Sequence, residues 1–79
     1  MQTIINSHNS VIIFKTNIET EQDVSRVASV FSNQPHILRW TVDREDIDHV
    51  LRIESKGADE LEIKQRVEYA GFMCEDLAD

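Results

Sequence analysis

The sequence predicts a single α+β domain spanning residues 1–79, with two helices packed on one face of a four-stranded antiparallel sheet. Three observations lead to this fold class. Two segments repeat apolar residues with helical spacing, four shorter segments have strand-like patterns, and their order along the chain is β-α-β-β-α-β. A chain of 79 residues is too short for a second domain. Residues 1–9, which precede the first pattern, are expected to be an N-terminal tail.

The first strand and the first helix are predicted from adjacent segments. Residues 11–14 are an unbroken β-branched and aromatic run, Val-Ile-Ile-Phe, which favours a strand. A helix is predicted over 21–33, before Pro35, because one helical stripe is formed by Val24, Val27, Ala28 and Phe31. Thr20 is followed three residues later by Asp23, which predicts a variant of the capping box at the start of this helix.

A β-hairpin is predicted in the middle of the chain. Polar residues alternate there with two apolar series, first Leu38, Trp40 and Val42, then Ile47, His49, Leu51 and Ile53. Only residues 44–46 separate the two predicted strands, and such a short connection is typical of an antiparallel pair.

The second helix and the last strand follow a short loop. Asp59 and Glu60 put negative charge at the predicted helix start, and the apolar positions are Ile63, Val67 and Ala70. Gly71 is a natural C′ residue that ends the helix, and residues 72–77 can supply a closing strand. With right-handed crossovers this order is the ferredoxin-like sandwich, which leaves one face of the sheet uncovered.

The first strand is apolar on both faces, which predicts an exposed apolar patch. Ile12 and Phe14 point to one side of the sheet, and Val11 and Ile13 point to the other. Alternation alone does not say which pair faces the helices. The pair on the uncovered face, together with Val50, is a candidate interface, and Val11, Ile13 and Val50 are the expected set. A protein partner or self-association would cover it.

Composition and motifs exclude several functional classes. The formal charge of -7 disfavours nucleic acid and anionic membrane surfaces. A single cysteine, Cys74, excludes an internal disulfide and favours the reducing cytoplasm. The sequence shows no signal peptide, no membrane span, no phosphate-binding loop and no nucleophile paired with a base. The expected protein is not an enzyme and carries no cofactor.

The chain resembles the heavy-metal-associated domains of copper chaperones and metal-transporting ATPases. Residues 14–18 read Phe-Lys-Thr-Asn-Ile, a string that precedes the metal motif in some bacterial members, and residues 24–27 fit the Val-x-x-Val that follows it. Residues 40–43, Trp-Thr-Val-Asp, and residues 70–72, Ala-Gly-Phe, resemble the family's hairpin and its last helix-to-strand turn. The resemblance covers most of the chain and implies the ferredoxin-like fold.

The same resemblance exposes one departure from the family pattern. Where the family has its Cys-x-x-Cys metal ligands, this chain has Thr20 and Asp23. Copper(I) selects thiolate or thioether ligands, so no soft-metal site is expected there, and we interpret the pair as a structural cap, with a hard-cation site as the lesser alternative. The function predicted is a binding or interaction domain that has lost the family's metal site.

A metal carrier with unconventional ligands is the alternative hypothesis. Its ligands would be Cys74, Met73 or a histidine, shared across a dimer, although His8, His36 and His49 are scattered along the chain. The acidic segment 43–48 lacks the glycine and the distant glutamate of a calcium loop, so it is interpreted as a solvated turn.

Overall fold

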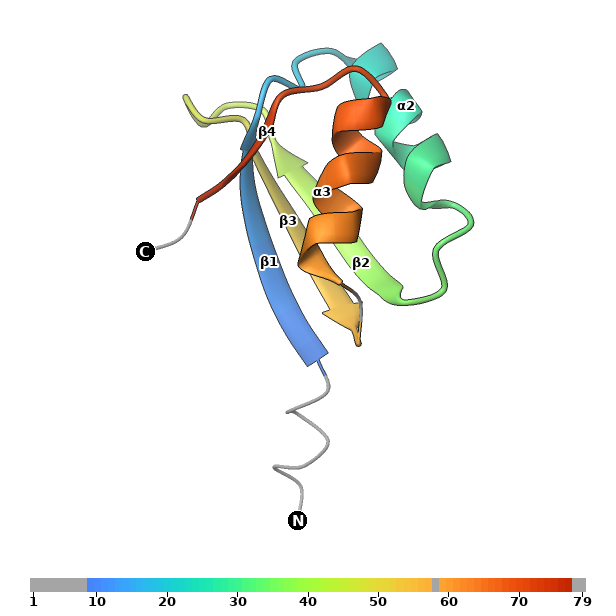
Figure 1. Cartoon of the computed structure of the whole chain (residues 1–79). Helices are drawn as coiled ribbons and strands as arrows, with labels where there is room; N and C mark the ends of the chain where they lie inside the picture. The colour runs from blue at the N-terminus through green and yellow to red at the C-terminus, as the bar shows by residue number, and fades with distance from the viewer. Residues whose placement is uncertain (1–8, 58, 78–79) are drawn as a thin grey trace.

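The computed structural model describes residues 9–57 and 59–77 and has the predicted order of elements (Figure 1). These elements are β1 (Asn9–Thr16), α2 (Glu21–Phe31), β2 (Ile37–Asp43), β3 (Val50–Lys56), α3 (Glu60–Tyr69) and β4 (Cys74–Asp76). Asn9 belongs to β1, and the rest of the predicted tail lies outside the described residues.

All neighbouring strands pair antiparallel in one sheet of order β2-β3-β1-β4. Figure 1 shows α2 and α3 side by side on the same face of this sheet. This is the ferredoxin-like α+β fold that the sequence predicts. Neither described helix is both long and apolar enough to cross a membrane.

The core lies between the sheet and the two helices, and it settles which face of β1 is covered. Ile12 and Phe14 point toward the helices and are buried, while Val11 on the other face is 52% exposed. The buried apolar residues form one cluster: Ile12, Phe14, Ile18, Val27, Phe31, Leu51, Ile53, Ile63, Val67, Phe72 and Cys74. Full burial of each large apolar side chain contributes about 1.5–3 kcal/mol to stability.

The predicted inward position of Leu38 is wrong, because β2 contains a bulge. The pairing of β2 with β3 shifts between Ile37 and Arg39, so Leu38 has no partner and is 53% exposed. An extra residue in one strand reverses the side to which its neighbours point. After the bulge, Trp40 and Val42 pack against the core, and the Trp40 ring meets Phe31 edge-on at 5.5 Å.

The third strand begins later than its alternation predicts. β3 starts at Val50, because His49 adopts a positive φ of 44° that breaks the extended backbone. Ile47 is 90% exposed in the preceding turn. The backbone N–H groups of Glu45 and Asp46 donate to Asp43 Oδ1, at 3.1 Å and 3.3 Å, so an aspartate at the end of β2 organises a longer turn.

The apolar stripe of α2 differs from the prediction at one position. Val27 and Phe31 are buried and Val24 packs against the core, but Ala28 is exposed and Val30 takes the fourth place. The helix also ends earlier, at Phe31. A small alanine gains little from burial, so the larger Val30 decides how the helix is rotated on the sheet.

The predicted end of α3 is confirmed. Gly71 has a φ of 104°, and its N–H donates to the Glu68 carbonyl at 2.9 Å. The Phe72 N–H donates to the Val67 carbonyl at 3.3 Å, which completes a Schellman motif. Phe72 is buried in the core, and the paired strand is therefore shorter than predicted, with β4 covering only Cys74–Asp76.

Candidate functional site

Three connections meet at one end of the sheet: the β1–α2 loop, the β2–β3 turn and the α3–β4 turn (Figure 1). The β1–α2 loop contains the predicted cap. The Asp23 N–H donates to Thr20 Oγ1 at 3.0 Å, and the Thr20 N–H donates back to Asp23 Oδ2 at 3.1 Å. This reciprocal pair is a capping box, as predicted.

The Asp23 carboxylate accepts hydrogen bonds from the backbone of this loop. The N–H of Glu19 also donates to Asp23 Oδ2, at 3.0 Å, so one oxygen accepts two backbone hydrogen bonds. These two hydrogen bonds, from Glu19 first and then Thr20, lower the pKa of Asp23 below its ordinary value. Asp23 is therefore ionised and engaged in capping at neutral pH.

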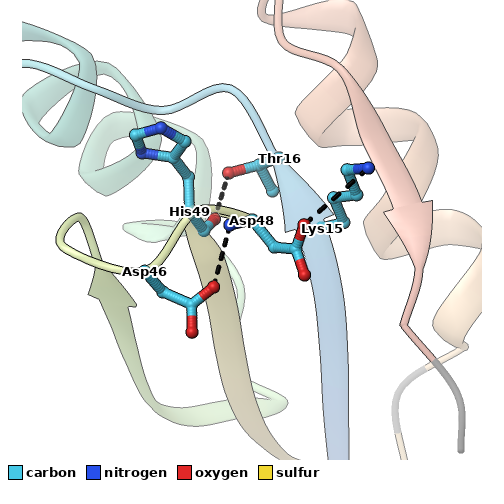
Figure 2. A network of polar contacts seen from close by, with 5 residues as sticks. All are labelled: Lys15, Thr16, Asp46, Asp48 and His49. Carbon is cyan, nitrogen blue, oxygen red and sulfur yellow. Dashed lines mark hydrogen bonds and ion pairs between the residues drawn. The ribbon is translucent and has the colours of Figure 1, made fainter.

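The β2–β3 turn fastens the loop from one side. Thr16 Oγ1 donates to the His49 carbonyl at 2.6 Å and accepts from the Ile18 N–H at 3.2 Å. Figure 2 shows this contact beside the 3.8 Å ion pair of Lys15 and Asp48. Further along, Arg44 Nη1 donates to the Glu19 carbonyl at 3.3 Å. The turn and the loop thus form one polar network.

The α3–β4 turn fastens the loop and α2 from the other side. Asn17 Oδ1 accepts from the Met73 N–H at 2.9 Å. Arg26 Nη2 donates to the Ala70 carbonyl at 2.7 Å, and its guanidinium lies 5.1 Å from the centre of the Phe72 ring. The loop is therefore held between two turns, and its backbone is pre-organised.

The side chains of Thr20 and Asp23 are not soft-metal ligands. Among residues 9–57 and 59–77, no three His, Cys, Asp or Glu side chains are grouped so that they could hold a metal ion. Thr20 and Asp23 supply a hydroxyl and a carboxylate, which are hard ligands that copper(I) does not prefer.

Cys74 and the described histidines do not belong to such a group either. Cys74 is 2% exposed, and burial, then the Glu68 carboxylate, raise the pKa of its thiol to about 12. A protonated thiol is a poor ligand, because metals bind the thiolate. His36 and His49 lie beyond opposite ends of β3, and His8 is outside the described residues. Met73, beside Cys74, is 38% exposed.

The structure also reveals a polar hollow that the sequence analysis did not single out. It has a volume of about 300 Å³ and is lined by Arg39, Trp40, Thr41, Arg52 and Glu54. The strand register puts all of these except Trp40 on the uncovered face of the sheet. Alternation in β2 and β3 was the available signal, because it puts these charged residues on the face opposite Leu51 and Ile53.

The predicted interface residues lie on this same uncovered face. Val11 pairs with Glu54 and Ile13 pairs with Arg52 across β1 and β3, and Val50 pairs with Asp43. Ile13 and Val50 are half-buried. Val11 and Ile13 are thus cross-strand neighbours of two residues that line the hollow.

Solved structures of other proteins share this fold. No family model matches the chain, and no curated protein matches it in sequence. A CsoZ metallochaperone superposes with a TM-score of 0.71 at 20% identity, over 84% of this chain and 96% of its own. Oxidized MerP from Ralstonia metallidurans CH34 gives 0.74 at 8% identity, over 89% and 99%. A copper-binding domain from the P-type ATPase HMA7 gives 0.73 at 20% identity, over 86% and 93%.

The chain has the same fold as these three proteins. The similarity extends over nearly the whole length of each of these proteins, which agrees with the fold implied by the sequence resemblance. At such low identity the superposition establishes a common arrangement of helices and strands, and it does not extend to the ligands in the β1–α2 loop.

Proposed function

We propose that this protein is a non-enzymatic interaction domain that keeps the heavy-metal-associated fold, has lost the soft-metal site, and binds a protein partner. The observation that carries the proposal is the capping box. Thr20 and Asp23 stand where the sequence resemblance puts two cysteines, and both side chains hydrogen-bond to the backbone at the start of α2.

The chemistry of the loop supports this proposal. Asp23 Oδ2 already accepts two N–H groups, so metal binding through that oxygen would have to displace the cap. The other sulfur ligand, Cys74, is buried and protonated. A pre-organised loop without thiolates retains a shaped protein surface while it offers little to copper(I).

The proposal extends to the setting in which the domain works. Two of the solved structures with this fold are described as a metallochaperone and as a copper-binding domain, and both descriptions support a non-enzymatic binding role for this chain. A single buried thiol suits a reducing compartment, and we place the protein in the cytoplasm on that ground.

A copper(I) competition assay tests the loss of the metal site. The full chain is titrated into a copper(I) complex of a colorimetric chelator, and elemental analysis of the purified protein is run beside it. The expected result is no withdrawal of copper at one equivalent of protein. Cys74→Ser is the matched control, because it removes the thiol from the described part of the chain.

Stoichiometric copper(I) binding by the wild type would refute the proposal. If Cys74→Ser abolished that binding together with a metal-dependent dimer, the result would support the alternative carrier that shares ligands between two copies. Copper binding that survives in Cys74→Ser would instead direct attention to Met73 and the histidines.

A further inference from the structure

The uncovered face of the sheet differs in chemistry from the rest of the molecule. The helices lie on the opposite face (Figure 1). Strand register places three aliphatic and several charged side chains on the uncovered side, and these include Val11, Ile13, Arg39, Thr41, Val50, Arg52 and Glu54. The protein as a whole carries a formal charge of -7.

The hollow in this face contains two arginines and one glutamate. Arg39 Nη2 lies 3.3 Å from Glu54 Oε1, so that pair is satisfied. Arg52 lies between Ile13 on β1 and Thr41 on β2, and in the described part of the chain no carboxylate is within ion-pair distance of it. The hollow is therefore locally positive on an acidic protein.

An apolar margin adjoins this positive hollow. Val11 is 52% exposed and Ile13 is half-buried, and both are direct cross-strand neighbours of the charged residues of β3. Arginine is enriched at protein-binding surfaces, and the buried centre of such a surface is more apolar than its rim.

We propose that this hollow binds an aspartate or glutamate side chain of a partner protein. Arg52 donates two hydrogen bonds to the partner's carboxylate, and Val11 and Ile13 contact an aliphatic residue next to it. The fork of an arginine suits a carboxylate in this way. This inference rests on the proposed function, since it names the surface and the partner chemistry of the interaction domain.

Charge complementarity favours this occupant over two others. A nucleic acid or an anionic membrane would meet the repulsion of the whole -7 molecule, whereas a single carboxylate flanked by aliphatic residues meets mainly the local field of the hollow. Two copies of this chain joined hollow to hollow would bring two locally positive surfaces together. The surface therefore fits a different protein.

A peptide selection tests the proposal. A random peptide library displayed on phage is selected against the full chain, and the affinities of the enriched peptides are measured by fluorescence anisotropy. We expect enrichment of Asp or Glu beside Val, Ile or Leu. Arg52→Ala should weaken binding at least tenfold and Arg52→Lys should weaken it less, because lysine keeps the charge but not the fork.

Arg66→Ala is the matched control, because Arg66 lies on α3, on the helix side of the molecule. This variant should change the affinity for the selected peptides less than twofold. Three results would overturn the proposal: no carboxylate among the selected peptides, equal binding by Arg52→Ala, or chemical-shift changes confined to the helices. Concentration-dependent dimerisation abolished by Arg52→Ala would also overturn it. Copper(I) uptake by the wild type would refute the proposed function while leaving the Arg52 result to be judged separately.

Discussion

At the start of α2, the Thr20 hydroxyl accepts the Asp23 N–H and so satisfies a helix donor that would otherwise lack a partner. Thr20→Ala is therefore expected to lower the free energy of unfolding by about 1 kcal/mol. Thr20→Ser, which keeps the hydroxyl, is the matched control and should stay close to the wild type. Urea unfolding at neutral pH measures both variants, and a neutral Thr20→Ala would mean that water replaces the cap without cost.

The Asp23 carboxylate should give this cap a pH dependence. Its folded-state pKa is lowered from an ordinary value of 3.8, chiefly by the N–H groups of Glu19 and Thr20. Ionised Asp23 therefore contributes to the free energy of unfolding in full at pH values above 3.8. This contribution is lost as the pH falls through the lower pKa of the folded state. In unfolding curves between neutral and acidic pH, Asp23→Asn should flatten this acid limb, whereas Glu21→Gln in the same turn should leave it in place.

His49 holds a backbone conformation that most residues avoid. Its φ is 44°, and its Nδ1 is buried without a hydrogen-bond partner among the described residues. Asparagine tolerates positive φ, so His49→Asn should match or exceed the wild type in thermal stability. His49→Val should lose about 1–2 kcal/mol, because a β-branched residue is strained there. Equal stability of the two variants would show that the turn relaxes to another conformation.

At the scale of the elements, the junction of α3 and β4 depends on one glycine. Gly71 has a φ of 104°, and a Cβ there would lie 3.2 Å from Arg26 Nη2. That guanidinium donates to the Ala70 carbonyl and covers Phe72. Gly71→Ala should therefore lower the free energy of unfolding by more than about 1 kcal/mol, which is the loss expected from the backbone conformation alone. Gly57→Ala is the control, since its φ is 72° but no atom lies within 4 Å of the added Cβ.

The start of α3 also approaches β4 through two carboxyl groups. A hydrogen bond with Asp76, then partial burial and the Asp76 charge, raise the pKa of Glu60 above 4.5. The folded protein holds this proton more tightly, so the pair favours folding at low pH and loses that contribution as pH rises through the raised value. At neutral pH, Glu60→Gln removes the repulsion between the two carboxylates. It should therefore raise the free energy of unfolding by about 0.3 kcal/mol, the size of an exposed charge interaction. Glu62→Gln, which breaks the ion pair with Arg66, should not.

Local sequence patterns predicted the elements better than their ends. The run 11–14 and the spacing of Ile63 and Val67 reported real strands and helices, because burial on one face imposes those periods. Apolar spacing does not reveal the bulge at Leu38 or the positive φ of His49. The two alternating apolar series of the predicted hairpin therefore include positions that do not face the core. Ala28 was misplaced because a stripe that wraps around a helix is compatible with more than one rotation.

In the candidate site, too, the sequence predicts local features and misses contacts between distant residues. The capping box at Thr20 and Asp23 was predictable, because it joins residues three positions apart. The contacts that hold the loop were not, because Arg26 and Ala70 are 44 positions apart and Arg44 and Glu19 are 25 apart. The hollow around Arg52 likewise needs the strand register, which places Thr41 and Ile13 beside it.

At the scale of the whole molecule, contacts from several elements hold the loop that contains Thr20 and Asp23. The backbone at Thr20 and Asp23 is held by α2, by Arg44 from the β2–β3 turn and by Asn17 bonded to Met73. None of these contacts requires a metal ion. The same frame should therefore present two thiolates if cysteines are placed at the two positions.

The double variant Thr20→Cys and Asp23→Cys tests this directly. It is expected to withdraw one copper(I) per chain from a colorimetric chelator, because thiolates at a helix N-terminus have a lowered pKa and suit a soft cation. Loss of the Thr20 cap should lower the stability of the metal-free form by about 1 kcal/mol. The two single-cysteine variants are the controls and should bind copper(I) far more weakly. A folded double variant without affinity would mean that the loop geometry differs from that of the heavy-metal-associated domains it resembles.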